Sequence, residues 1–536
     1  MVSENDSAQR RNAYLILMLI ALSIVAGRIA TVSSKEGDTA FLSANDRSRW
    51  CTIAALVEAR TYEIDQLINL KNNKGRRPWY TIDMVRHRGT DGQLHYYSSK
   101  PPLFPTLVAG VYWLVYQASG MTLSGQPIYV GRIVLALVNL PLLALFFAGT
   151  IGTIERLGSG QWTRITMAGA TCFATMMMPF AVALNNHLVA AASTALVMVI
   201  YVSAAVSRSE AEGGSSGPTS KWIWLIGGMA AGFTAANELP ALSMLVFWCL
   251  LVLLLDYRAT LSFLTGIAIV AAAFFGTNKL AHDSYRPPYT HRDDGARIAM
   301  IESTELPPAA KQVAQTLSNN DVEFDSFEEL EIMPSGESAR WVVQSADQRL
   351  FSLRQVTPDE GSVWELRHWD DWYDYPTSYW VEGKRKGVDL GEPSRGRYFA
   401  NMTLGHYGIF SLTPIWCLVP IGFLVGLFSG PSSIRRFVFV VAVATVVCMA
   451  FYLMRPEIDR NYGGVSSCFR WMLWFAPLWL AVIVPVVQWC SRGTATRFVI
   501  VVLLACSVFS MAISLESPWQ HPWIYRFWSF LGWISG

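Results

Sequence analysis

The sequence lacks the short motifs that mark most soluble enzymes and nucleic-acid-binding proteins. It has no glycine-rich phosphate loop, no zinc-type spacing of cysteine and histidine, and no nucleophile elbow. The eight cysteines form no C-x-x-C pair, and most lie inside apolar runs, where a small buried hydrophobe is the simpler interpretation. Charged residues make up only 15% of the chain and the formal net charge is +2, so no basic field for a nucleic acid exists.

Long hydrophobic runs are what the sequence does have. Hydrophobic residues make up 52% of it. Apolar runs of about 18 residues or more recur, and each can cross a hydrocarbon core of roughly 30 Å. The first run, 12–32, follows Arg10 and Arg11; its short core before Arg28 leaves a cleaved signal peptide open. We favour a retained anchor, because no A-x-A-like site follows, and we predict a polytopic membrane protein.

Basic residues in the short connections predict the topology. Arg156, Arg164, Arg258 and Arg492 all fall on one side if the run 128–154 passes from outside to inside, which satisfies the positive-inside rule. About eleven spans and an outer C-terminus follow. After the first run, the expected spans are 128–154, 163–181, 185–206, 222–237, 238–256, 260–281, 407–429, 435–453, 469–488 and 498–514.

The apolar segment Pro102–Gly120 does not fit this topology as a span. A span there would invert every later loop and reverse the positive-inside bias. Its aromatic residues Phe104, Tyr112, Trp113 and Tyr116 suit a membrane interface. We therefore expect a helix that lies in, or dips into, the outer interface.

The polar segments predict the domain organisation. Residues 1–281 form a transmembrane module with an outer loop at 33–127, residues 282–406 an extracytoplasmic insertion, and residues 407–536 a C-terminal transmembrane segment. Within the insertion, "RWVVQS", "RLFSLRQV" and "VWELRHW" alternate apolar and polar residues, which predicts a small β-meander. The expected fold is an all-α polytopic membrane protein with juxtamembrane helices in the first outer loop and a small α+β insertion.

Asp46 is the first candidate for chemistry. It stands in "SANDRSRW", ahead of apolar residues at helical spacing, so it begins an amphipathic helix. One interpretation is a helix cap that accepts hydrogen bonds from the first free amides. The other is a general base that takes a proton from an acceptor hydroxyl or amine. The local pattern leaves both open.

Lys100 is the second candidate, in "SSKPPLFP". A lysine at a membrane edge can simply reach toward headgroups. However, Pro101 keeps Lys100 out of helical backbone angles, and Pro102 begins the next helix without losing a hydrogen bond. The lysine is thereby directed at the interface, where a lipid phosphate would lie.

These two motifs together resemble the GT-C glycosyltransferases of the protein O-mannosyltransferase and aminoarabinose-transferase type, over residues 13–281. That family has an acidic D-E-x-R-Y motif in its first outer loop, followed by K-P-P or H-P-P. The resemblance implies Asp46 as the base, Lys100 as the contact to a polyprenyl-phosphate donor, and Arg49 with Trp50 at the R-Y positions. Arg47 stands where the family has a second acid, which puts a two-carboxylate site in question.

Other polar residues gather on the predicted outer face. Ionisable groups at membrane depth are functional candidates, although a structural pair between helices is an equal alternative. Arginine forks match phosphate oxygens, so two loop arginines are candidates for the donor phosphate. The candidate residues are Asn186, His187, Glu238 and Tyr462 for substrate, and Arg455 and Arg460 for phosphate. The aromatic and acidic stretch 368–380 suits either sugar contact or packing of the insertion onto the membrane, and we favour packing.

The function that these residues predict is an integral-membrane glycosyltransferase. It would move a sugar from a polyprenyl-phosphate carrier to an extracytoplasmic acceptor (protein, lipid or glycan) with inversion, at the outer face of the plasma (inner) membrane. We expect no cofactor, no metal site and no nucleic-acid partner. A transporter or flippase of a lipid-linked or anionic substrate is the main alternative, although no internal repeat is evident. An inactive relative that serves as a scaffold is another, because of Arg47.

Overall fold

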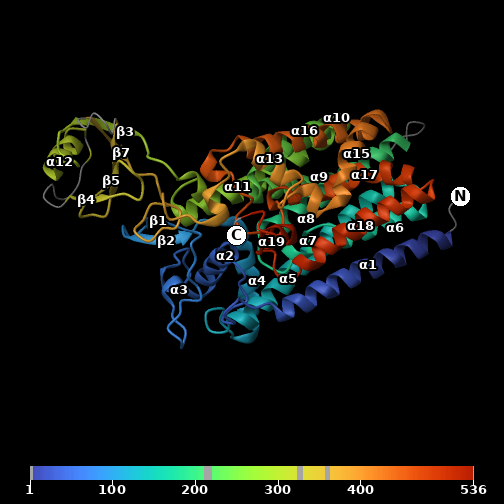
Figure 1. Ribbon diagram of the computed structural model, residues 1–536, viewed down its shortest axis with the longest axis horizontal. Coiled ribbons are helices and arrows are strands. Elements are labelled where there is room, and N and C mark those ends of the chain that lie inside the picture. The colour runs from blue at the N-terminus through green and yellow to red at the C-terminus, as the bar shows by residue number, and fades with distance from the viewer. Residues whose placement is uncertain (1–3, 211–219, 321, 323–329, 357–362, 535–536) are drawn as a thin grey trace. The chain divides into compact units, whose positions relative to one another are not determined.

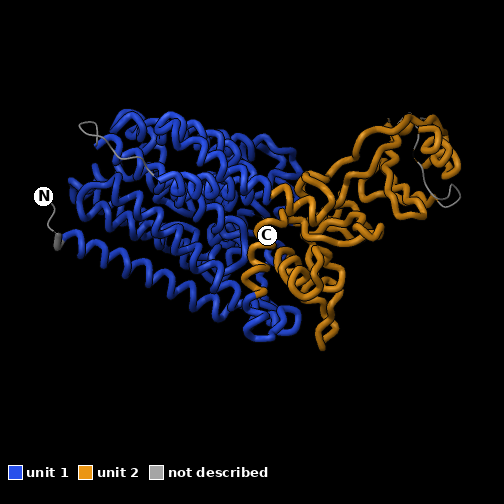
Figure 2. The backbone as a smooth tube through the Cα atoms, turned by 180° about the vertical axis from the view of Figure 1, so that it is seen from behind, with its two compact units in different colours: residues 1–46, 114–273, 387–536 blue, residues 47–113, 274–386 orange. Residues whose placement is uncertain are grey.

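The computed structural model describes residues 4–210, 220–320, 322, 330–356 and 363–534. Most of these residues are helical, and a small sheet is present (Figure 1). They divide into two compact units (Figure 2). We call residues 1–46, 114–273 and 387–536 the helical unit, and residues 47–113 and 274–386 the mixed unit. This division differs from the sequence-based one, because the first polar loop and the insertion contribute to one unit.

Seven helices of the described residues are long and apolar enough to cross a membrane. They have mean hydropathies of 1.8 to 2.6 over an 18-residue window. The seven segments are Asp6–Thr31 (within α1, Glu4–Thr31), Pro127–Leu157 (α5), Asn186–Glu210 (α8), Tyr257–His282 (α11), Ser432–Met454 (α16), Arg470–Cys490 (η7 and α17) and Thr494–Ser514 (α18). The chain is therefore a multi-pass membrane protein by the length and composition of its helices.

The other four expected spans coincide with shorter or interrupted helices. Seven of the eleven expected spans are therefore long enough, as single helices, to cross a membrane. Residues 222–237 fall on the 17-residue α9. Residues 238–256 contain one helical run of Leu239–Leu255, which begins with a 3-10 turn, and the other two are interrupted by irregular residues. The helices concerned are α6 (Gln161–Phe173), α7 (Met177–Phe180), α9 (Lys221–Asn237), η2 (Leu239–Ala241), α10 (Leu242–Leu255), α14 (Ile409–Leu412), η5 (Pro414–Cys417) and α15 (Leu418–Phe428). Their crossing of a membrane stays a prediction.

The break between α7 and α8, at residues 181–185, has a visible cause. The Asn139 side chain, inside α5, donates to the carbonyls of Ala181 and Ala183 at 2.9 and 3.0 Å. The Asn185 side chain donates to the carbonyl of Ala183 at 2.8 Å. Because these amides satisfy the carbonyls that a continuous helix would pair, irregular backbone persists in a buried place. The expected boundary between the spans 163–181 and 185–206 falls at this break, and the amide that satisfies its carbonyls comes from another helix.

Close backbone approach holds α9 against α11. A Cβ on Gly228 would lie 1.9 Å from the Phe263 carbonyl oxygen, and one on Gly266 would lie 2.2 Å from the Leu225 carbonyl oxygen. Small residues at helix contacts let two backbones come together, and packing then replaces the hydrophobic effect as the source of stability in lipid. Gly228 and Gly266 therefore allow α9 and α11 to pack at this short distance.

The expected β-meander is confirmed and forms part of a larger sheet. β5 (Arg340–Gln344), β6 (Leu350–Gln355) and β7 (Val363–His368) pair antiparallel in sequence order. β3 (Arg297–Glu302) adds to β7 and β4 (Glu331–Pro334) adds to β5, which gives the order β3-β7-β6-β5-β4. The core of this sheet contains Val343, Leu353, Trp364 and Leu366, and α12 (Ala310–Asn319) adds Val313 and Leu317 to it.

A second, smaller sheet lies in the first polar loop, where the sequence pattern predicted only helices. β1 (Met84–Arg88) and β2 (Leu94–Ser98) form an antiparallel hairpin. Val85 and Tyr97 pack with Trp372 and Tyr373, and the Trp380 indole N–H donates to the Ile82 carbonyl at 2.7 Å. The aromatic stretch 368–380 thus packs against this hairpin within the mixed unit, which is an internal role for rings that we expected at the membrane surface.

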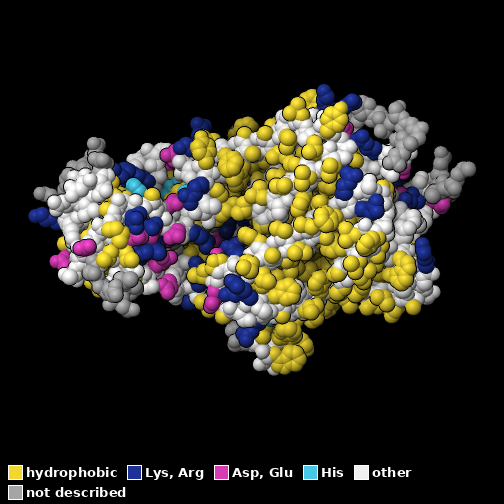
Figure 3. Space-filling model, turned by 90° about the horizontal axis from the view of Figure 1, so that it is seen from above, with side chains coloured by type: hydrophobic (Ala, Val, Ile, Leu, Met, Phe, Trp, Pro, Cys, Tyr) yellow, Lys and Arg dark blue, Asp and Glu magenta, His cyan; other side chains and the backbone are white. Residues whose placement is uncertain are grey.

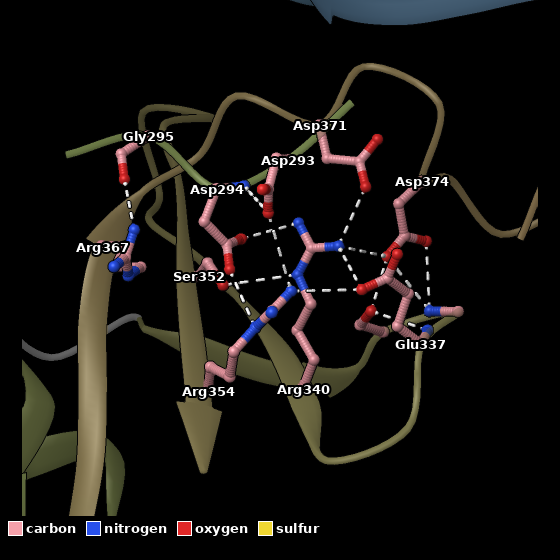
Figure 4. Close-up of polar contacts among 12 residues, drawn as sticks. Asp293, Asp294, Gly295, Glu337, Arg340, Ser352, Arg354, Arg367, Asp371 and Asp374 are labelled. Atoms are coloured by element: carbon pink, nitrogen blue, oxygen red, sulfur yellow. Dashed lines mark hydrogen bonds and ion pairs between the residues drawn. The ribbon is translucent and has the colours of Figure 1, made fainter. Parts of the chain in front are cut away.

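A buried ionic cluster connects the five-stranded sheet to the segment after β7 (Figure 4). The Arg340 side chain, 1% exposed, lies 2.9 Å from Asp371 and 2.8 Å from Asp294. Glu337 lies 3.3 Å from Arg340 and 3.2 Å from Arg354. Burial raises the pKa of the Asp371 carboxyl, against the lowering effect of Arg340. Removing this guanidinium would leave several buried carboxylates without their counter-charge.

Three buried histidines form a further polar cluster in the mixed unit. His87 Nε2 and His282 Nδ1 are 3.0 Å apart, and the His87 ring stacks on Tyr97 with centroids 4.1 Å apart. His291 stacks on Trp372 at 3.5 Å and its Nδ1 lies 2.5 Å from Asp370. Burial lowers the pKa of His87 to about 4, so this ring is neutral near pH 7.

The remaining elements complete the description. All eight cysteines are free. The short helices that connect the larger elements are η1 (Ala55–Ala59), α3 (Asp65–Asn69), η3 (Pro288–Thr290), η4 (Gly387–Leu390), α13 (Arg395–Thr403), η6 (Glu457–Asp459) and α19 (Trp523–Phe530).

Candidate functional site

Asp46 lies in the first turn of α2 (Ala44–Ala54), the helix that the sequence pattern predicts. Its carboxylate accepts hydrogen bonds from the Ser43 N–H at 2.7 Å, the Ser43 hydroxyl at 2.9 Å and the Leu42 N–H at 2.9 Å. In return, the Ser43 hydroxyl oxygen accepts from the Asp46 N–H at 3.2 Å. This is the reciprocal arrangement of a capping box. Asp46 is fully buried, and its two oxygens are fixed in orientation by the backbone just before the helix.

The two sequence motifs that carry the resemblance meet through their serines. Ser48, two residues after Asp46, has its hydroxyl 2.6 Å from the Ser98 hydroxyl, 50 residues further along the chain. The Ser48 hydroxyl also lies 2.5 Å from the Asp83 carbonyl oxygen, to which it donates. Ser48 and Ser98 are both buried. Ser48, Asp83 and Ser98 therefore belong to one polar cluster within the mixed unit, and Asp46 belongs to the helical unit.

Lys100 is fixed in this cluster at both its backbone and its side chain. Its N–H donates to the Ser98 hydroxyl at 3.2 Å. Its Nζ lies 3.1 Å from an Asp83 carboxylate oxygen, with the two side chains 19% and 11% exposed. Pro101 and Pro102 follow, and α4 begins at Leu103, as the sequence predicts. The ammonium is thus held by a half-buried ion pair with Asp83. A lysine that only reaches toward headgroups would have no such partner.

Helix α4, Leu103–Ser119, occupies the segment that we expected to lie at the interface. Tyr112 is buried, and its hydroxyl donates to Glu58 at 2.6 Å. Trp113 is 51% exposed. The helix is confirmed, and its position at an outer interface stays a prediction.

The two arginines of the first motif lie on α2 with Asp46. The Arg47 guanidinium donates to the Tyr80 carbonyl at 2.8 Å. Arg49 is 4% exposed. Arg47 thereby reaches the loop that leads to Asp83, whose carboxylate lies on the strand side of the same cluster.

Asn186, His187 and Glu238 come together in the helical unit. His187, at the start of α8, is 1% exposed and its Nδ1 lies 2.5 Å from a Glu238 carboxylate oxygen. The Asn186 amide donates to the same oxygen at 2.7 Å. His187 Nε2 lies 2.6 Å from Nη1 of Arg470. Because a guanidinium can only donate, Nε2 is the accepting nitrogen and Nδ1 carries the proton toward Glu238.

Arg470 is a member of this cluster that the sequence analysis missed. It begins η7 (Arg470–Phe475), 283 residues from His187, and lies over the Trp519 ring with its central carbon 5.0 Å from the ring centroid. Its Nε donates to the Gly463 carbonyl at 2.7 Å. The available signal was an arginine at the start of an apolar run, which a positive-inside count treats only as loop charge.

The two arginines expected to bind phosphate form ion pairs with acids of their own loop. Arg455 lies 2.9 Å from Asp459, and Arg460 lies 3.7 Å from Glu457. Tyr462 is 5% exposed and stacks on Tyr407 with ring centroids 4.4 Å apart. Its hydroxyl accepts from the Asn401 amide at 3.1 Å. These contacts give all three residues structural partners, and their contact with a substrate stays a prediction.

Among the residues that the structure describes, no group of three or more His, Cys, Asp or Glu side chains has the arrangement of a metal site. The first-loop cluster, which consists of Ser48, Asp83, Ser98 and Lys100, offers a carboxylate, an ammonium and serine hydroxyls. Such groups can take a proton and stabilise a leaving phosphate. Asp83, in this cluster, is a further residue that sequence reasoning missed, because its contact with Lys100 is what distinguishes it from other loop acids.

Comparison with known proteins gives a distant likeness. No protein-family model matches the chain, and no curated protein does. Among solved structures, the chain is similar to the Archaeoglobus fulgidus oligosaccharyltransferase in its apo form, at 10% identity and a TM-score of 0.44. It is also similar to the oligosaccharyltransferase AglB from Archaeoglobus fulgidus in complex with an inhibitory peptide and a dolichol-phosphate, at 11% identity and a TM-score of 0.43.

Both alignments cover 97% of this chain and 57% of the other chain, so this chain spans a little over half the length of those structures.

Proposed function

We propose that the chain is an integral-membrane glycosyltransferase that moves a sugar from a polyprenyl-phosphate donor to an extracytoplasmic acceptor. The observation that carries this proposal is the cluster in which Ser48 of the first motif bonds Ser98 of the second, beside the ion pair of Lys100 and Asp83. The sequence resemblance requires these two motifs to act together. The hydrogen bond between the two serines supports that requirement independently of the resemblance.

In the proposed reaction, a hydroxyl or amine of the acceptor attacks the anomeric carbon of the donor sugar. The bond from that carbon to the phosphate oxygen breaks as the new bond forms, and polyprenyl phosphate leaves with the electron pair. The carboxylate of Asp46 takes the proton of the acceptor. The Lys100 ammonium stabilises the charge that develops on the phosphate. One displacement from the opposite face inverts the configuration at the sugar carbon.

Asp83 acts in this scheme as a positioning residue. Its carboxylate holds Nζ of Lys100 at 3.1 Å, so the flexible lysine stem has one preferred position before the donor arrives. Arg455 and Arg460 remain candidates for the donor phosphate, and Arg49, Asn186, His187, Glu238 and Tyr462 for substrate contact.

The experiment is a transfer assay with the full chain in proteoliposomes. Radiolabelled polyprenyl-phosphate mannose and polyprenyl-phosphate aminoarabinose serve as donors, and an extract of membrane proteins and lipids serves as acceptor. Time-dependent movement of label from the donor to acceptor material supports the proposal. Label that crosses the bilayer while still attached to the lipid carrier would indicate a transporter and contradict it.

A further inference from the structure

A groove lies at one end of the helical unit, between helix ends far apart in the sequence. It has a volume of about 770 Å³ and lies between the last turns of α8, the start of α9, the end of α10 and the start of α11. By the positive-inside rule this end faces the cytoplasm, away from the predicted outer face that carries the proposed reaction. The groove is therefore separate in topology from the first-loop cluster.

Three cations and one acid line the groove. The cations are Arg208, Lys221 and Arg258, all exposed. The acid, Asp256, accepts from the Arg258 N–H at 3.1 Å at the start of α11, so its carboxylate is engaged by the backbone. Among the described residues, Lys221 forms no ion pair. The groove thus presents a net positive charge that its own acid does not neutralise.

The groove also has apolar walls, which an acyl chain could contact. The walls include Val199, Ile200 and the Trp224 side chain, which is 1% exposed. Tyr257 at the rim is 69% exposed, and aromatic rings of this kind concentrate at membrane–water interfaces. Hydrophobic side chains cover much of the visible face of the helices in Figure 3. A ligand of this groove therefore needs both an anionic head and an apolar body.

The end of α10 holds one of the cations in place, and a second contacts a neighbouring tyrosine. A guanidinium N–H of Arg208 donates to the Leu255 carbonyl, the last residue of α10. The Nε of Arg258 donates to the Tyr257 hydroxyl at 3.1 Å. Ser207, one residue before Arg208, adds a hydroxyl to the lining. Fixed donors beside an apolar wall are the arrangement that recognises a phosphate next to a glycerol ester.

We propose that this groove binds an anionic glycerophospholipid, with the headgroup phosphate at Lys221 and Arg258 and an acyl chain along Val199 and Ile200. The net positive charge selects an anionic headgroup over a zwitterionic one. The apolar walls select a lipid over free phosphate. The site gives the chain a second lipid contact, at the opposite membrane face from the donor carrier.

The test uses the full chain purified in detergent and native mass spectrometry. The probes are phosphatidylglycerol, cardiolipin, phosphatidylcholine and inorganic phosphate, each added separately. We expect bound phosphatidylglycerol or cardiolipin, and much less phosphatidylcholine. The double variant Lys221→Gln with Arg258→Gln should lower anionic-lipid occupancy by roughly tenfold or more, since each cation near a headgroup contributes on the order of 1 kcal/mol.

The matched control is Arg435→Gln with Arg492→Gln, which removes two exposed cations that do not line the groove. It should keep the bound lipid. The proposal is overturned if both double variants lose anionic-lipid occupancy equally, or if phosphatidylcholine binds as well as the anionic lipids. It is also overturned if inorganic phosphate stabilises the chain against heat as much as lipid does. The single variant Lys221→Gln, at an exposed position, gives the same answer at a smaller fold-change if the double variant does not fold.

Discussion

Asp83 is the residue on which the position of the Lys100 side chain depends most. The lysine backbone is fixed by Pro101 and by the Ser98 hydroxyl, but its four-carbon stem is flexible, and the carboxylate 3.1 Å away holds the ammonium. The pair is partly exposed, so its contribution to stability is small, on the order of 1 kcal/mol. Its importance is therefore in orientation.

Replacing Asp83 by Asn should raise KM for the polyprenyl-phosphate donor about tenfold, a change of about 1.4 kcal/mol in binding, with a smaller change in kcat. The thermal unfolding midpoint should move only slightly. Steady-state kinetics in proteoliposomes measure both parameters. The control is Asp91→Asn, in the turn between β1 and β2. The Asp91 side chain is 52% exposed, and this variant should leave KM unchanged. An unchanged KM in Asp83→Asn would remove the positioning role.

At the scale of elements, the β1–β2 hairpin contains two histidines with opposite responses to pH. Burial lowers the pKa of His87 to about 4. For His95, burial lowers the pKa, but the hydrogen bond with Asp91 and the charges of Glu63 and Asp65 outweigh it, and the pKa is raised. Between pH 6.5 and 4 the unfolded chain binds more protons at His87 than the folded chain does. Stability from His87 is therefore lost as the pH falls through this window.

Between about pH 7 and pH 4, the free energy of unfolding of the wild type should fall by about 3 kcal/mol more than that of His87→Phe. The phenyl ring keeps the stacking on Tyr97 but cannot take a proton. Thermal unfolding followed by tryptophan fluorescence at several pH values gives this difference. In His95→Phe the difference should have the opposite sign, because the stability from His95 is present below its unfolded pKa and is lost as the pH rises through its raised folded pKa. Parallel pH profiles for wild type and His87→Phe would contradict the assignment.

The pairing of α9 with α11 gives a second prediction at this scale. Gly228→Ala places a methyl group against the Phe263 carbonyl and should destabilise the chain by about 3 kcal/mol. Gly169→Ala, in α6, meets no atom within 4 Å and should be neutral or stabilising by up to about 1 kcal/mol. Thermal midpoints in detergent compare the two. Equal midpoints would show that the helices do not depend on this close approach.

At the scale of the whole molecule, the topology follows from one helix. α5, Pro127–Leu157, lies between Ser119 and Ser159, both exposed. In a cysteine-free background, Ser119→Cys should react with a membrane-impermeant thiol reagent from outside, and Ser159→Cys only after the membrane is opened. Labelling of intact cells measures this. A cytoplasmic residue 119 would make α4 a span and invert the expected sides of every later loop.

Regular local patterns predicted much of the fold, and contacts between distant residues explain what was missed. Alternation predicted β5 to β7, and apolar spacing after Asp46 predicted α2. The expected cap was Asp46, whereas the structure has Ser43 at the cap and Asp46 in the first turn. The carbonyls between α7 and α8 are satisfied by the Asn139 amide from another helix, which no local pattern contains. Likewise, the motifs predicted Asp46 and Lys100, whereas Asp83 and Arg470 become visible only through their partners Lys100 and His187.

The transfer rate of Asp46→Asn and Lys100→Ala tests the proposed function most directly. In proteoliposomes with a radiolabelled polyprenyl-phosphate sugar, Asp46→Asn should lower the transfer rate by about 10²-fold or more, because it removes the base. Lys100→Ala should lower it by a similar factor, because it removes the ammonium that stabilises the negative charge on the leaving phosphate. Arg435→Gln, outside both sites, should transfer at the wild-type rate. If Asp46→Asn and Lys100→Ala both transfer as fast as the wild type, the proposed mechanism is wrong.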